Sequence, residues 1–221
     1  MSASTTPRQS PLIQPLGDHG LIVRFAETLS DAANRAAIGF ASGARGANLP
    51  GVTEVASNLV SVLLKYDPAQ VAYETLAGEV RLLVGGVGTD TAETPPQRTV
   101  RVRFDGDDVG TVAAALNLSP DAFIASHCAR PLRVLATGFA PGFVYCGFHP
   151  EELAVPRRTE VRGAVPAGTV IFAARQTAIT STPIPTGWHV IGHTDFSNFD
   201  PAQEPPTTLR EGEELTFEAI T

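Results

Sequence analysis

A run rich in glycine, threonine and proline, from Gly85 to Gln97 (GGVGTDTAETPPQ), separates the chain into two parts of different character. The run has no apolar period, and this composition is typical of a linker between domains. A chain of 221 residues is long enough for two domains, each with its own hydrophobic core. We therefore expect a flexible lead-in over residues 1–16, a first domain over 17–84, a linker over 85–97 and a second domain over 98–221.

The part before the linker predicts a small α+β layer. The apolar segment 21–25 is typical of a strand, and Ser30 and Asp31 offer a helix cap before the alanine-rich stretch that follows. β-Branched residues predict a buried strand over 57–66, and one-sided apolar spacing predicts a helix over 68–83 that begins at Pro68. Strands and helices in this order indicate a sheet covered by helices.

The part after the linker predicts a β domain. Val100, Val102 and Phe104 alternate with charged residues, which indicates a half-buried strand, and two short helices are expected after it. Short apolar segments separated by proline and glycine then recur at 132–136, 168–173, 188–192 and 214–217. Many short strands with frequent turns favour a closed, barrel-like domain.

Composition excludes several classes of function. The formal net charge of -7 argues against nucleic acid or an anionic membrane as the main partner, because both require clustered Lys and Arg. The N-terminus lacks the apolar core of a secretory signal, and no run of 18 apolar residues occurs, so we expect a cytoplasmic protein. Cys128 and Cys146 are then expected to be small buried hydrophobes rather than a disulfide, with a catalytic thiol as the alternative.

Common catalytic and cofactor motifs are missing from the sequence. It contains no GxxxxGK[ST], GxGxxG, CxxC, HExxH or GxSxG, so neither a metal site nor a nucleophile elbow is predicted. His149, His189 and His193 lie near one another in the sequence. His189 and His193 could pair as metal ligands, but no third metal ligand is evident. We interpret these histidines as surface or internally hydrogen-bonded residues.

The segment GFAPGFVY, residues 138–145, sets a Pro-Gly turn between two phenylalanines and ends on a tyrosine. Pro141 followed by Gly142 fits a type II turn, because proline presets φ and glycine accepts a positive φ. Phe139, Phe143 and Tyr145 then have two interpretations. They form either the wall of a pocket with a polar tip or, as phenylalanine commonly does, anchors of the core.

Four further positions suggest a binding site, each with a structural alternative. Arg157 and Arg158 could bind a carboxylate or phosphate bidentately, or remain a solvated pair. Gln176 could offer a donor and an acceptor to an amide-like substrate, or stabilise its own loop. Trp188, after Gly187, could form the floor of a pocket or fill the core.

Taken in order, the segments GFAPGFVYCGF, ELAVPRR, VPAGTV, RQTAI, PTGWHVIGHT and FDP resemble the family of the 5-oxoprolinase B subunit, also described as allophanate hydrolase subunit 1 or KipI-like proteins. The resemblance extends from about Gly17 to Phe217. It implies an N-terminal ferredoxin-like region followed by a cyclophilin-like β-barrel. Arg175 stands at a position where this family commonly has glycine.

The resemblance also implies an activity shared between proteins. A second barrel-type subunit and a third protein would complete the ATP-dependent opening of 5-oxoproline to glutamate, with ATP at or shared with the partner. Arg157 or Arg158 would offset developing charge, while Tyr145, Gln176 and His127 would orient the substrate or move protons. The other family positions carried over are Gly138 and Pro156, together with the pocket residues Phe139, Pro141, Gly142, Phe143, Gly187 and Trp188.

Other functions remain open within the same resemblance. The chain could be an allophanate hydrolase or urea-degradation subunit, or a KipI-like inhibitor of a sensor histidine kinase. A lone barrel with prolyl isomerase activity is a third alternative, although a fold does not carry an activity with it.

Overall fold

The structure, a computed structural model, describes residues 10–86 and 96–221. The chain divides into two compact units, residues 1–93 and 94–221. Residues 87–95 of the predicted linker lie outside the described residues. Of the remaining linker positions, Gly85 and Gly86 end a helix, Gln97 begins a strand, and Pro96 precedes that strand.

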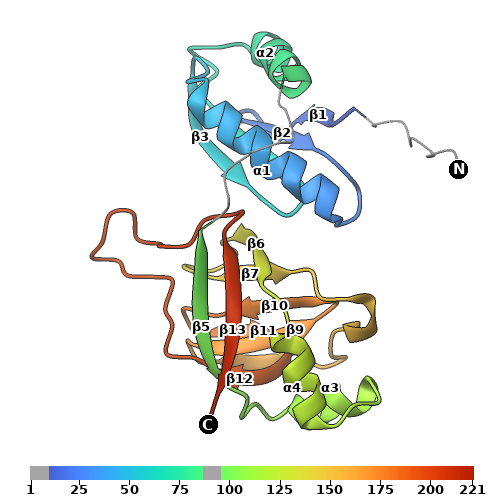
Figure 1. The fold of residues 1–221 in the computed structure, drawn as a ribbon. Coiled ribbons are helices and arrows are strands. Elements are labelled where there is room, and N and C mark those ends of the chain that lie inside the picture. The colour runs from blue at the N-terminus through green and yellow to red at the C-terminus, as the bar shows by residue number, and fades with distance from the viewer. Residues whose placement is uncertain (1–9, 87–95) are drawn as a thin grey trace, which may run out of the picture. The chain divides into compact units, whose positions relative to one another are not determined.

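The first unit is an antiparallel sheet with the strand order β1-β2-β4-β3, against which helices pack (Figure 1). From β2 onward its elements follow a β-α-β-β-α order, and β1 adds an edge strand beside β2. Its described elements are β1 (Leu12–Pro15), β2 (Gly20–Arg24), α1 (Asp31–Gly46), β3 (Val52–Ser57), β4 (Ser61–Tyr66) and α2 (Tyr73–Gly86).

Local chemistry accounts for α1 and its packing. Ser30 caps the helix, because its side chain accepts a hydrogen bond from the Ala33 amide at 3.2 Å. The buried face of α1 places Phe40 in a core with Leu21 and Leu64 of the sheet. This hydrophobic burial holds the helix against the strands.

Three sequence predictions in this unit need correction. The lead-in predicted over residues 1–16 is wrong for Leu12–Pro15, because β1 pairs antiparallel with β2 over that whole range. The single strand predicted over 57–66 is divided by a turn, in which the Asn58 amide donates to the Ser61 carbonyl at 2.8 Å. Helix α2 begins at Tyr73, five residues later than predicted, because Asp67 organises a turn that precedes it.

The second unit is a closed barrel with the strand order β10-β7-β6-β13-β5-β12-β9. All its pairs are antiparallel except β13 with β5, which is parallel. The predicted α+β class, with a sheet-and-helix region before a closed β-barrel, is confirmed. The barrel strands are β5 (Gln97–Arg103), β6 (Leu132–Thr137), β7 (Val144–Gly147), β9 (Thr169–Ala173), β10 (Gln176–Ile179), β12 (His189–His193) and β13 (Glu214–Ile220).

Short elements complete this unit around the barrel. They are the helices α3 (Val109–Ala115) and α4 (Pro120–Cys128), the short 3-10 helix η1 (Glu151–Leu153), and a two-stranded ribbon of β8 (Arg162–Val165) and β11 (Ile184–Thr186). Ser119 caps α4 by accepting a hydrogen bond from the Ala122 amide at 3.2 Å, with Pro120 in the first turn as predicted.

Strand alternation produces two apolar clusters in the barrel unit. The first, called the inner core here, receives buried side chains from all seven strands, including Val170 and Phe172 of β9. The second, called the outer cluster, contains Ile171 and Ala173 of the same strand and is joined by Val165 of the β8–β11 ribbon. Side chains of one strand alternate between the two faces of a sheet, so the outer cluster lies on the outside of the barrel wall.

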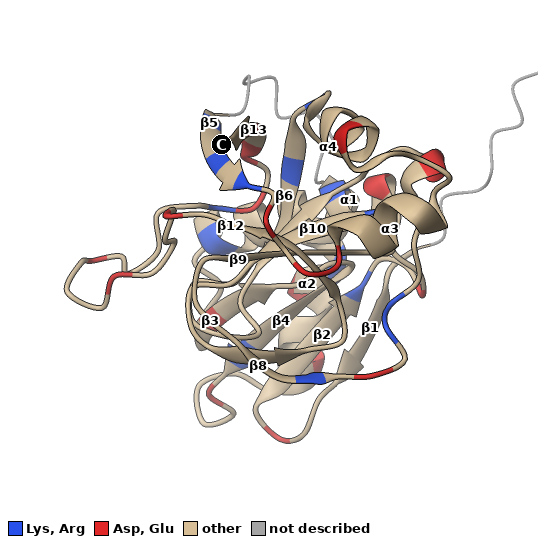
Figure 2. Cartoon of the chain, turned by 90° about the horizontal axis from the view of Figure 1, so that it is seen from below, with Lys and Arg blue, Asp and Glu red and all other residues tan. Residues whose placement is uncertain are grey.

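Acidic and basic residues are distributed over the chain, and Figure 2 shows Lys or Arg residues along β5. Two of the three β5 arginines are paired with carboxylates of neighbouring segments. Arg101 lies 3.4 Å from Glu218, and Arg103 lies 3.4 Å from Asp195. Within residues 10–86 and 96–221, no helix is long and apolar enough to span a bilayer.

Candidate functional site

A row of aromatic rings runs along the outer cluster of the barrel. The ring centroids of Phe139 and Phe143 lie 5.7 Å apart, those of Phe143 and Tyr145 lie 4.7 Å apart, and those of Tyr145 and Trp188 lie 6.1 Å apart. Val144 and Cys146, the neighbours of Tyr145 on β7, point into the inner core. Alternation along β7 therefore places the tyrosine ring on the outside, against Trp188.

The turn that carries the first two rings has the predicted geometry. The Phe143 amide donates to the Ala140 carbonyl at 3.0 Å, and Gly142 has a φ of 68°, as the third position of a type II turn requires. A Cβ at Gly142 would lie 2.5 Å from the Cβ of Phe199, so only glycine fits.

Phe139 differs from Phe143 in backbone conformation and in solvent exposure. Its φ of 78° lies in the left-handed region, which costs a non-glycine residue about 1–3 kcal/mol. Its side chain is 76% exposed, whereas Phe143 is 2% exposed. The turn thus buries one phenylalanine as a core anchor and presents the other to solvent.

The guanidinium of Arg157 lies at the other end of the aromatic row, with its Cζ 5.5 Å from the centroid of Trp188. This arrangement is a cation–π contact. Among the described residues, no carboxylate forms an ion pair with Arg157. The Arg157 charge is therefore available to a ligand, and the apolar face of Trp188 orients it.

Arg157 also lines a cavity of about 360 Å³, called the arginine pocket here. The lining continues through Arg158 and Thr159 to His189. His189 Nε2 donates to the Pro156 carbonyl at 3.0 Å, since a carbonyl oxygen can only accept, and its buried Nδ1 has no hydrogen-bond partner within the described residues. Glu160 also lines the pocket, which thus combines arginine, a hydroxyl, a carboxylate and a histidine edge.

Arg158, unlike its neighbour, is fixed by a buried carboxylate. Asp108 accepts from Arg158 Nη1 at 2.6 Å, from Arg162 Nη2 at 2.9 Å and 3.0 Å, and from the Val190 amide at 2.7 Å. Burial by itself would raise the pKa of Asp108, but the Val190 amide and the two arginines outweigh it and hold that pKa below its usual value. Arg158 is thus held in place by Asp108.

Two polar side chains complete the outer face near the aromatic row. Burial raises the pKa of Tyr145, and nearby Arg157 partly opposes this, so the phenol keeps its proton at neutral pH. Gln176, on β10 beside β7, is buried, and its Oε1 has no hydrogen-bond partner within the described residues. A hydroxyl and an amide oxygen are therefore carried by adjacent strands.

His127 lies on the other side of the wall, fully buried on α4 within the inner core. Its Nε2 lies 2.8 Å from Thr177 Oγ1, which is also 2.8 Å from His149 Nε2. A threonine hydroxyl can donate to one ring and accept from the other. The three side chains form a hydrogen-bonded chain inside the barrel, and within the described residues none of them is hydrogen-bonded to a residue that lines the arginine pocket.

Burial keeps both of these rings neutral. It lowers the pKa of His127 well below its usual value, with the neighbouring His149 adding to the effect. It also lowers the pKa of His149 to about 4, with the charges of Arg130 and Arg175 adding to the effect. Arg175 takes a φ of 64°, and its Nε donates to the His149 carbonyl at 2.9 Å.

This network predicts a loss of stability in mild acid. The unfolded chain binds a proton at His149 below about pH 6.5, while the folded chain does so only near pH 4, so stability is full above 6.5 and falls as the pH decreases. Between pH 7 and pH 5 we expect the free energy of unfolding to fall by at least about 2 kcal/mol.

Urea unfolding at the two pH values measures this change, and the buried carboxylates contribute little to it because their unfolded pKa lies lower. The variant His149→Asn removes one of the two titrating rings and should show a smaller fall. An equal free energy of unfolding at pH 7 and pH 5 in the unaltered protein would contradict the buried, neutral assignment.

The structure brings part of the predicted site together on the outside of the barrel wall and places His127 apart from it, inside the barrel. The aromatic row joins Phe139, Phe143, Tyr145, Trp188 and Arg157 on one face. Gly187 lies next to Trp188, and its carbonyl accepts from the Arg158 amide at 2.8 Å. Pro141 and Gly142 shape the turn.

Three residues important to the geometry were not singled out as site residues by the sequence. They are Asp108, Arg162 and Thr177. The resemblance includes Asp108 only through its overall range, from about Gly17 to Phe217. Cys128 and Cys146 lie against or within the inner core, and burial raises both thiol pKa values, that of Cys128 to about 11.

Among the described residues, no group of three or more His, Cys, Asp or Glu could hold a metal ion.

Comparison with known proteins gives a consistent set of similarities. Residues 11–209 match the family described as carboxyltransferase domain, subdomain C and D. The chain is 29% identical to the B subunit of 5-oxoprolinase from Bacillus subtilis over 222 aligned residues, covering 95% of this chain and 92% of that protein. It is 43% identical to the B subunit of 5-oxoprolinase from Escherichia coli O157:H7 over 112 residues, covering 51% of each.

A solved structure shows a similar fold within a longer chain. The crystal structure of TTHA0988 superimposes with a TM-score of 0.80 at 32% identity and covers 95% of this chain. This chain spans only 40% of TTHA0988.

Proposed function

The chain belongs to the family of the carboxyltransferase domain, subdomain C and D, and on that premise we propose that it is the B subunit of a 5-oxoprolinase. In this proposal it works in a cytoplasmic complex with a second barrel-type subunit and a lactam-opening protein. The complex converts 5-oxoproline, ATP and water into glutamate, ADP and phosphate. The similarity to 5-oxoprolinase B subunits over most of the chain supports the assignment.

The observation that carries the proposal is the Arg157 guanidinium above Trp188 at the arginine pocket. A five-membered lactam fits in a cavity of about 360 Å³, because pockets of about 300 Å³ already hold larger, drug-sized ligands. Val155 and Pro156 of the lining offer apolar surface to the ring, and Arg157, which contacts Trp188, offers a charge to an oxygen anion. Thr159 and His189 of the lining supply hydrogen-bonding groups for orientation, whereas Tyr145 and Gln176 lie outside this lining.

The chemistry explains why a cation is needed. An amide carbonyl is a poor electrophile until its oxygen is activated, and transfer of the ATP γ-phosphoryl group to that oxygen provides the activation. Water then adds to the carbon, the ring C–N bond breaks, the nitrogen takes a proton, and an acyl phosphate remains. A second water molecule then displaces phosphate from this acyl group and leaves the side-chain carboxylate of glutamate. Negative charge develops on oxygen during these steps, and a fixed guanidinium stabilises it.

Roles within this chain follow from the geometry. Arg157 is proposed to act on the substrate, and Arg158 to position the pocket loop through Asp108. His127 is proposed to stabilise the inner core, because its ring is fully buried and bonded to Thr177. The sequence has no nucleotide-binding motif, so ATP is proposed to bind on the partner or at the junction with it.

A second candidate function is favoured by one observation. Phe139 is held in a left-handed conformation with its ring 76% exposed, which is a costly way to present an apolar group to water. A KipI-like inhibitor, which acts by docking on a sensor histidine kinase, would use such a ring. An allophanate hydrolase or urea-degradation subunit would use the arginine pocket for a different amide.

The experiment that tests the proposal is reconstitution. We expect the chain, co-expressed with its second barrel-type subunit and the lactam-opening protein, to elute with them and to form glutamate from 5-oxoproline only when ATP is present. Glutamate is measured with and without this chain. Proteins that elute separately at micromolar concentration, with no glutamate formed, would contradict the proposal. Turnover of allophanate instead would assign the urea-degradation function.

A further inference from the structure

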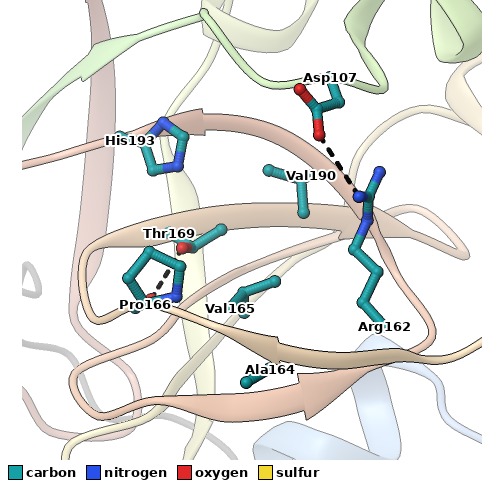
Figure 3. A pocket seen from close by; sticks show the side chains of 8 residues that line it. All are labelled: Asp107, Arg162, Ala164, Val165, Pro166, Thr169, Val190 and His193. Atoms are coloured by element: carbon teal, nitrogen blue, oxygen red, sulfur yellow. Dashed lines mark hydrogen bonds and ion pairs between the residues drawn. The ribbon is translucent and has the colours of Figure 1, made fainter.

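A smaller cavity of about 190 Å³ lies between the β8–β11 ribbon and the barrel strands β9 and β12 (Figure 3). Figure 3 shows Arg162 at one end of this cavity and His193 at the other, with Val190 and Val165 between them. Its volume corresponds to about six water molecules at about 30 Å³ each, so it fits a small molecule. The arginine pocket has a different lining, and Asp108 lies between the two through its bonds to Arg158 and Arg162.

The histidine end of the cavity is a carboxylate–imidazole pair. His193 Nδ1 lies 2.7 Å from Asp105 Oδ1, and because a carboxylate can only accept, Nδ1 carries the proton. The pKa of Asp105 is lowered chiefly by this hydrogen bond. In the neutral ring, Nε2 is then an oriented acceptor, and no described residue is hydrogen-bonded to it. This is the arrangement by which a carboxylate orients a basic histidine.

The arginine end holds a guanidinium with hydrogen-bonding capacity left over. Asp108 fixes Arg162 through Nη2, while Nη1 reaches Asp107 at 3.3 Å. The Asp107 side chain is 80% exposed, so this ion pair is weak and a ligand carboxylate can replace it. Arg162 Nε is buried and has no hydrogen-bond partner within the described residues. An unsatisfied buried donor beside a cavity calls for an explanation.

The floor of the cavity limits what lies between these ends. Val165 and Val190 provide apolar surface, and the hydroxyl of Thr169 is already committed as a donor to the Pro166 carbonyl at 2.7 Å. Thr169 Oγ1 can therefore only accept from a ligand on this side. Each end thus selects one group, a carboxylate at Arg162 and a hydrogen-bond donor at His193.

We propose that this cavity is a second ligand site, which binds a small carboxylate bearing an N–H or O–H donor. The carboxylate pairs with Arg162, the short apolar body packs on Val165 and Val190, and the donor reaches His193 Nε2. The site is separate from the arginine pocket, and it does not depend on the function proposed for that pocket.

The test uses the imidazole proton resonances of His193, assigned by their loss in His193→Gln. The protein carries Arg157→Ala, so that ligand in the arginine pocket does not contribute. The probes are 5-oxoproline, which has an N–H, and L-lactate, which has an O–H. Their matched controls are cyclopentanecarboxylate and propionate, which keep the carboxylate and lack the donor. We expect saturable shifts, with at least one probe binding about tenfold more tightly than its control.

A cavity-filling variant completes the design. Ala164 lines the cavity and is exposed, so Ala164→Leu should obstruct it and weaken binding at least about tenfold without unfolding the protein. Ala167→Leu, an exposed position outside the lining, is the control and should leave the affinity unchanged. Absence of a saturable shift with both probes overturns the proposal, as do equal affinities for probes and controls or unchanged binding in Ala164→Leu.

Discussion

Replacing Asp108 by alanine is expected to lower the free energy of unfolding by about 3–5 kcal/mol, the usual result of removing one partner from a buried charge cluster. The Asp108 side chain is only 6% exposed, and it bonds two guanidinium groups that are 24% and 29% exposed. Without it, Arg158 and Arg162 would repel each other in a poorly solvated site, and the Val190 amide would lose its acceptor. The stability of the barrel and the positions of the arginines that line both cavities would change together.

The neighbouring residue provides a matched control. Asp107→Ala removes the same side chain one position earlier, but that side chain is 80% exposed and makes a single ion pair at 3.3 Å. Exposed pairs contribute up to about 1 kcal/mol, so this variant should unfold almost as the unaltered protein does. Chemical denaturation of both variants makes the comparison. Equal destabilisation in Asp107→Ala and Asp108→Ala would contradict the view that Asp108 organises the site.

Replacing Phe143 by alanine is expected to cost about 3–5 kcal/mol, because a large buried ring is lost and a cavity remains. Phe143 is 2% exposed and packs between Phe139 and Tyr145 in the outer cluster. Its ring holds the turn against the barrel wall. Folding of the whole turn, and with it the position of Tyr145, should depend on this residue.

Phe139→Ala is the matched control for that variant. The same ring is removed from the same turn, but it is 76% exposed, so the change in unfolding free energy should stay within about 0.5 kcal/mol. Thermal melts of the two variants show which of the two rings supports the fold, and Tyr145→Phe, measured alongside, shows what the tyrosine hydroxyl contributes. A larger loss in Phe139→Ala than in Phe143→Ala would reverse the assignment of core and surface.

The fold class could be predicted because it depends on patterns that are local in the sequence. Alternation along residues 100–104 and caps such as Ser30 and Ser119 each specify one element through nearby residues. The Pro141–Gly142 turn was predicted for the same reason, since φ preferences belong to single residues. By contrast, β1 was missed because its four residues become a strand only through pairing with β2.

The site was harder to predict because adjacent identical residues have different environments. Arg157 is exposed above Trp188, whereas Arg158 is held by Asp108. Asp107 and Asp108 differ in the same way. The two members of each pair have the same chemistry, and only long-range packing decides which of them faces solvent. His127 illustrates the same limit, since its place inside the barrel depends on partners 22 and 50 positions away, His149 and Thr177.

The central claim is that Arg157 stabilises charge during lactam opening, and the kcat/KM of the reconstituted complex for 5-oxoproline tests it most directly. Arg157→Gln removes the charge, and Arg101→Gln, at an arginine whose side chain is 73% exposed on β5, is the matched control. We expect Arg157→Gln to lower kcat/KM by about 100-fold with an unchanged melting temperature, and the control to keep full turnover. Full turnover by the complex carrying Arg157→Gln would contradict the claim.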